Sequence, residues 1–73
     1  MSEKTEMMAD MVKNLAVMLT EQNSGMTIEE ALATVFNSDT YRKVMDEKTH
    51  FYHQSYYYVF AFLKEELTRG KFD

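Results

Sequence analysis

The chain has 73 residues, 45% of them hydrophobic, with seven Met, five Phe and five Tyr but no Cys. A formal net charge of −4 weighs against nonspecific binding to nucleic acid or anionic lipid, because that binding depends on clustered Lys and Arg. The absence of Cys excludes disulfides and a structural zinc site of the usual thiolate kind.

A chain of this size has room for one domain, residues 1–73, and buries only about 60% of its unfolded surface. Self-association is therefore the remaining source of further stability that we expect. The first residues, Met1 to Glu6, are polar and of mixed charge, unlike a signal peptide. The longest uncharged apolar run, Tyr56 to Leu63, is too short to span a bilayer. We therefore expect a cytoplasmic protein with no membrane partner.

The first predicted helix runs from about Glu3 or Glu6 to Gln22. Its apolar residues recur at spacings of three and four, as on one buried helical face. This face comprises Met8, Met11, Val12, Leu15, Met18 and Leu19, with Met7 at its edge. It covers about 140° of the helix, which is broad for a single contact surface. Asn23-Ser24-Gly25 ends the helix, and Gly25 suits the left-handed C′ position.

The second predicted helix has the clearest start, because Thr27-Ile28-Glu29-Glu30 is a capping box with Thr27 as the N-cap. Its apolar face consists of Ile28, Ala31, Leu32, Val35 and Phe36. Asn37-Ser38-Asp39 breaks this pattern, and Ser38 or Asp39 can cap a short third helix. That short helix carries Tyr41, Val44 and Met45. Residues 46–49 then form a turn, and residues 50–54 an extended or irregular connector.

The last predicted helix runs from Tyr56 to about Arg69, with Ser55 as its N-cap and Gly70 at its end. At about 100° per residue, one apolar stripe contains Tyr56, Val59, Phe60, Leu63 and Leu67. Tyr58 and Phe62, here called the second aromatic pair, lie outside this stripe, and a partner chain would explain them.

These patterns predict an all-α fold, a compact bundle of three main helices plus one short helix. We expect its core to contain Leu15, Leu19, Leu32, Val35, Phe36, Phe60 and Leu63.

Four short segments resemble a family of small bacterial proteins of unknown function. They are Ile28-Glu29-Glu30-Ala31-Leu32, Phe36-Asn37-Ser38-Asp39-Thr40-Tyr41, Tyr52-His53-Gln54-Ser55 and Leu63-Lys64-Glu65-Glu66-Leu67. In that family a helix with this EEAL start precedes an S-x-T-Y step, then a tyrosine, a serine cap and a terminal amphipathic helix. The resemblance covers roughly the last two-thirds of the chain. It implies an all-α fold and brings with it no activity, cofactor or catalytic residue.

Side chains that could support metal binding or nucleophilic catalysis are few. His50 and His53 could bind a metal with Asp46 or Glu47, but a histidine pair beside a turn is usually solvated surface. His53 and Ser55 lack the third orienting group and the oxyanion hole that a nucleophile and base require.

The carboxylate pairs Glu29-Glu30 and Glu65-Glu66 would need a pocket that shifts their pKa values to act in acid–base catalysis. Glu29 and Glu30 fit the first turn of a helix, where negative charge is favoured. We expect Glu65 and Glu66 on a solvated face. We therefore predict that the protein is not an enzyme and binds no metal or cofactor.

The leading functional hypothesis is a non-catalytic protein-interaction module that forms a homodimer. We expect Tyr58, Phe62, Met7 and Met18 to contribute to its interface, because aromatic and Met side chains are enriched at interfaces. The physiological partner of such a module would be another small protein, such as a co-encoded toxin or regulator.

The rival hypothesis is a small DNA-binding regulator, in which the second and third helices form a helix-turn-helix. The third helix offers only Arg42 and Lys43 for phosphate contacts, against Asp39 and Asp46 at its ends. Nucleic acid is therefore the less favoured partner.

Overall fold

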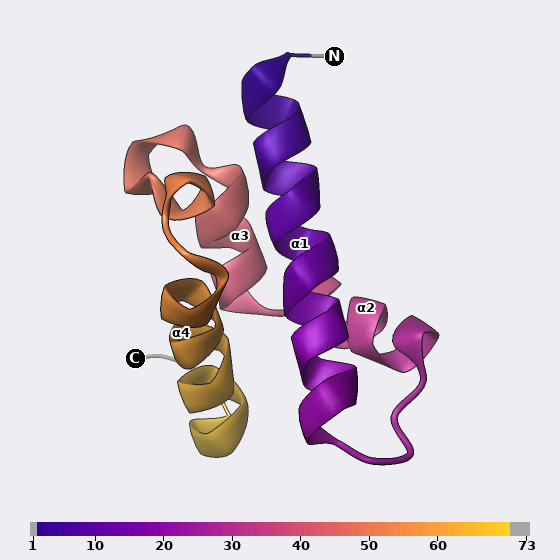
Figure 1. Ribbon diagram of the computed structural model, residues 1–73. Coiled ribbons are helices and arrows are strands. Elements are labelled where there is room, and N and C mark those ends of the chain that lie inside the picture. Colours follow the sequence, from indigo (N-terminus) through magenta and orange to yellow (C-terminus); the bar gives the residue numbers. More distant parts are fainter. Residues whose placement is uncertain (1, 71–73) are drawn as a thin grey trace.

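Four α-helices account for most of residues 2–70, the range that the computed structural model describes (Figure 1). They are α1 (Glu3–Gln22), α2 (Ile28–Phe36), α3 (Asp39–Met45) and α4 (Tyr56–Arg69), and no strand occurs in this range. Two single turns of 3₁₀ helix, η1 (Glu47–Thr49) and η2 (Phe51–His53), connect α3 to α4. The predicted all-α bundle of three main helices plus one short helix is confirmed.

Each α-helix begins at a hydroxyl-bearing N-cap, because Ser and Thr side chains can accept a hydrogen bond from an otherwise unpaired N–H of the first turn. The four caps are Ser2, Thr27, Ser38 and Ser55. At Thr27 the capping box is complete. The Glu30 N–H donates to Thr27 Oγ1 over 3.1 Å, and the Thr27 N–H donates to Glu30 Oε1 over 2.9 Å. The hydrogen bond from the Thr27 backbone lowers the pKa of the Glu30 carboxyl.

The end of α1 differs in detail from the prediction. Asn23 is the C-cap, so Gly25 lies one position beyond C′. Gly25 has a φ of 93°, a conformation that suits glycine, and the Met26 N–H donates to the Asn23 carbonyl oxygen across this turn. Gly70, with a φ of 91°, is the C-cap of α4, as expected.

Helix α1 is the longest element, and the other helices pack along it. In Figure 1, α4 lies beside α1 and runs in the same direction. Side chains that are almost fully buried form one core between the helices. They include Met11, Leu15, Leu19, Val35, Val44, Val59, Phe60 and Leu63. Among the described helices, none is long and apolar enough to cross a membrane.

Four residues of the predicted core and apolar stripe are less buried than expected. Phe36 was wrongly placed in the core, because it is the last residue of α2 and 51% exposed. Leu32 is half-buried. Tyr56 and Leu67 are also exposed, since they lie at the two ends of α4, where the neighbouring helices no longer cover the stripe.

Truncation of Leu63, which is fully buried, should cost about 2–5 kcal/mol of unfolding free energy, because the cavity is surrounded by other core side chains. Leu67→Ala is the matched control, one turn later on α4 and 44% exposed, and should cost about 1 kcal/mol or less. Urea denaturation of the two variants measures the difference. Equal losses would mean that the buried face of α4 is misassigned.

Thr27→Ala should lower the unfolding free energy by roughly 1 kcal/mol, because the reciprocal bonds with Glu30 satisfy two backbone donors. Thr68→Ala is the control, since the Thr68 hydroxyl bonds only to a carbonyl within its own helix. If thermal melts of Thr27→Ala overlay those of the wild type, the capping box contributes nothing to stability.

Candidate protein-interaction surfaces

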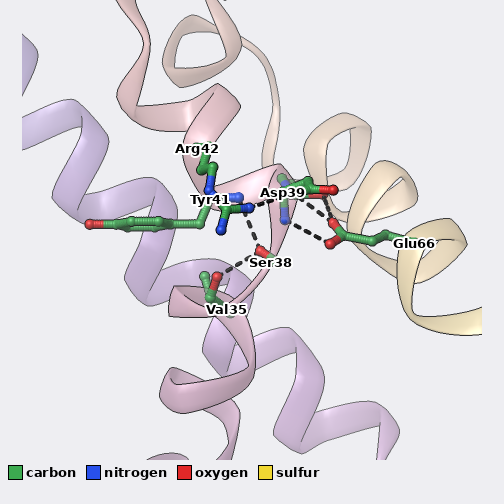
Figure 2. A network of polar contacts seen from close by, with 7 residues as sticks. Val35, Ser38, Asp39, Tyr41, Arg42 and Glu66 are labelled. Carbon is green, nitrogen blue, oxygen red and sulfur yellow. Dashed lines mark hydrogen bonds and ion pairs between the residues drawn. The ribbon is translucent and has the colours of Figure 1, made fainter. Parts of the chain in front are cut away.

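Glu66 is the one buried carboxylate of the described chain, at 5% exposure, and it joins two helices (Figure 2). Its Oε2 accepts a hydrogen bond of 2.7 Å from the Asp39 N–H. Its Oε1 accepts bonds of 3.0 and 2.8 Å from the N–H and the hydroxyl of Thr40. The expectation that Glu66 lies on a solvated face was wrong: the side chain leaves α4 and caps the first turn of α3.

A second cap acts on the same turn. Ser38 Oγ accepts a bond of 3.0 Å from the Tyr41 N–H and donates one of 2.6 Å to the Val35 carbonyl oxygen (Figure 2). Both oxygens of the Glu66 carboxylate accept hydrogen bonds from the first turn of α3, two from backbone N–H groups and one from the Thr40 hydroxyl. The arrangement joins α2, α3 and α4 and has the character of a structural site.

The geometry at the start of α3 weighs against its use as a recognition helix. The Glu66 carboxylate and Asp39 place two negative charges there, and Arg42 is held by an ion pair with Asp39. The apolar side of α3 contributes the fully buried Val44 to the core.

An apolar groove of about 330 Å³ runs between α1, α2 and α3. We call it the α1–α3 groove. Its apolar lining comprises Ala9, Val12, Leu32, Phe36, Tyr41 and Met45. The polar members of the lining are Thr5 and Lys13, both on α1.

Helix α1 contributes Ala9 and Val12 to the apolar side of the groove, and α2 and α3 contribute the larger side chains of Leu32, Phe36, Tyr41 and Met45. The rings of Phe36 and Tyr41 meet edge to face, with centroids 5.2 Å apart. Phe36 and Met45 are 51% and 43% exposed. Exposed apolar side chains gathered in one groove are typical of a protein-binding surface.

The second aromatic pair has a neighbour that the sequence pattern did not reveal. The rings of Tyr58 and Phe62 are 5.3 Å apart, and the Phe51 ring lies 6.2 and 5.0 Å from them. Phe51 is positioned by η2, whose first N–H bonds to Thr49 Oγ1 over 3.2 Å. Phe62 is half-buried by this contact, while Tyr58 remains 48% exposed.

Met7 and Met18, the other two residues expected at the interface, are half-buried against the core. Met7 lines a hollow with Tyr56 and Tyr57, on a different side of α4 from Tyr58 and Phe62. Of the four expected interface residues, Tyr58 and Phe62 are thus in contact with each other, and Met7 lines a separate hollow. The α1–α3 groove gathers two exposed apolar side chains, Phe36 and Met45, beside the half-buried Leu32 and Tyr41.

The two histidines lie close together, with ring centroids 6.1 Å apart. Within residues 2–70 no three His, Asp or Glu side chains gather in a way that could hold a metal ion. Ser55 Oγ accepts a 3.1 Å bond from the Tyr58 N–H, which confirms it as the N-cap of α4.

Neither a known protein family, nor a curated protein sequence, nor a solved structure gives a significant match to the chain.

Glu66 and Glu65 offer a direct comparison of a buried and an exposed carboxylate. At neutral pH, Glu66→Gln should lower the unfolding free energy by about 1.5–3 kcal/mol, because it weakens bonds from three donors to a charged acceptor. Glu65→Gln should cost about 0.5 kcal/mol or less, since it removes only an exposed pair with Arg69.

The loss of unfolding free energy caused by Glu66→Gln should depend on pH. Burial raises the pKa of the Glu66 carboxyl, but the bonds from Asp39 and Thr40 and the charge of Lys43 bring it below its usual value of 4.5. With a depressed folded-state pKa, the carboxylate stabilises fully above 4.5, and this stabilisation is lost as the pH falls through the folded-state pKa. The difference between wild type and Glu66→Gln should therefore narrow below pH 4.5 in urea denaturation. An unchanged difference in acid would contradict this assignment.

Proposed function

We propose that the protein is a non-catalytic protein-interaction module that self-associates through the α1–α3 groove. The observation that carries the proposal is the groove itself, where Phe36 and Met45 are about half exposed beside Leu32 and Tyr41. A small single core is marginally stable, and pairing of two such grooves would bury this apolar surface.

The proposed occupant is a second copy of the chain, arranged about a two-fold axis. Ile28, Leu32 and Phe36 are spaced by four residues and form one row along α2. If two copies pack with their α2 helices antiparallel, Leu32 meets its own equivalent and Ile28 meets Phe36 of the second copy. Such an interface is self-complementary, as a two-fold dimer requires.

Charge supports the same arrangement. Lys13 lines the groove near Leu32 and Phe36, while Glu29 is exposed in the first turn of α2, next to Ile28. Antiparallel pairing brings the start of one α2 over the end of the other. Glu29 of one copy then lies beside Lys13 of the other, and the contact occurs twice.

The oligomeric state tests the proposal. By light scattering coupled to gel filtration, the wild type should be a dimer at tens of micromolar. Phe36→Glu should be a folded monomer, because it places a charge on an exposed position of the groove. Tyr58→Glu is the matched control, with a similar exposed fraction at the second aromatic pair, and should remain a dimer.

Charge-reversal variants provide a second test of the proposed contact between Lys13 and Glu29. Lys13→Glu should weaken the dimer by about fivefold, and addition of Glu29→Lys should restore it, because the double variant exchanges the two charges. A monomeric wild type would overturn the proposal. Dissociation by Tyr58→Glu without an effect of Phe36→Glu would place the interface at the second aromatic pair instead.

A further inference from the structure

A hollow of about 380 Å³ lies on another flank of α1, between that helix and the start of α4. We call it the tyrosine hollow. Its lining includes Met7 and Asp10 from α1, Tyr52 and His53 from η2, and Tyr56 and Tyr57 from α4. The proposed dimer leaves it open, because the α1–α3 groove lies elsewhere on α1 and the two linings share no residue.

The lining combines aromatic rings with an unpaired negative charge. Tyr52 is buried at the base of the hollow, and Tyr57, the most exposed large apolar residue in the described chain, is 79% exposed at its edge. The Asp10 carboxylate forms no ion pair within residues 2–70. Glu3 lies two turns before Asp10 on the same side of α1 and adds to the negative potential.

Two lysines of α1 flank Asp10 in sequence, Lys13 three residues after it and Lys4 six residues before it, and within residues 2–70 neither forms an ion pair with it. Lys4 Nζ donates to Glu47 Oε1 over 2.6 Å. This hydrogen bond, the charge of Glu47 and the neighbouring Tyr52 raise the pKa of the Lys4 amine. This pairing directs the Lys4 charge toward η1, and the Asp10 carboxylate at the tyrosine hollow remains without an ion pair in the described residues.

We propose that the tyrosine hollow binds a small organic cation of the quaternary or methylated ammonium class. Such a cation is attracted by the electron-rich faces of tyrosine rings, and several rings together with a carboxylate are the usual means of recognising it. The cavity volume falls in the range of small-molecule sites. The overall net charge of −4 also favours a cationic over an anionic ligand.

Choline chloride is the probe, followed by amide chemical shifts in two-dimensional NMR, with sodium chloride at equal ionic strength as the reference. Saturable shifts should be confined to residues 7–10 and 52–57. The neutral isostere 3,3-dimethylbutan-1-ol should bind about tenfold more weakly, because it has the shape of choline without its charge.

Matched variants test the two components of the site. Asp10→Asn and Tyr57→Ala should each weaken choline binding by about five- to tenfold, and both positions are exposed, so the fold is retained. Glu21→Gln, an exposed carboxylate near the other end of α1, and Tyr58→Ala should leave binding within about twofold of the wild type. Non-saturable shifts, equal binding of the neutral isostere, or equal losses in the control variants would each overturn the proposal.

Discussion

The hydrogen bonds that Glu66 accepts from Asp39 and Thr40 attach α3 to α4. They stabilise α3, a helix that its local sequence alone would not stabilise. A seven-residue helix is too short to be stable alone. The conformational entropy lost in forming the first helical turn exceeds the stabilisation from the few hydrogen bonds that follow. Here the carboxylate satisfies two backbone N–H groups of the first turn and the Thr40 hydroxyl. Burial of its charge is tolerated because every bond that it accepts comes from a well-placed donor.

Helix α1 provides the surface on which both proposed sites are built. Its 20 residues span about 30 Å, whereas α2 covers only part of that length. Ala9 and Val12 on one flank line the α1–α3 groove, and Met7 and Asp10 on another flank form part of the tyrosine hollow. A partner chain and a small cation could thus be bound at the same time, since neither lining contains a residue of the other.

Local features of the fold could be predicted from the sequence because their causes lie within a few residues. The capping box at Thr27, the N-cap at Ser55 and the short third helix after Ser38 all depend on contacts three residues apart. The buried face of α4 could be predicted in its middle, at Phe60 and Leu63, but not at its ends.

The features that were missed depend on residues distant in the chain. Phe51 covers part of the second aromatic pair from a 3₁₀ turn, where the hydrophobic pattern has no helical period. The burial of Glu66 could have been predicted, because Glu66 follows Val59 by seven residues and Leu63 by three and so lies on their side of α4. Its hydrogen-bond partners, Asp39 and Thr40, could not have been predicted, because nothing near Glu66 in the sequence indicates that it contacts the start of α3.

That separation affects the order in which the chain can fold. Thr40 and Glu66 are 26 residues apart, so the Glu66 carboxylate can cap α3 only after a loop of that size has closed, whereas the Ser38 cap is local. The α1–α2 pair depends on a short turn at Gly25, whereas the Glu66 bonds to α3 require α4 to have docked. We therefore expect the short helix in the middle of the chain to reach its full stability only when the bundle is complete.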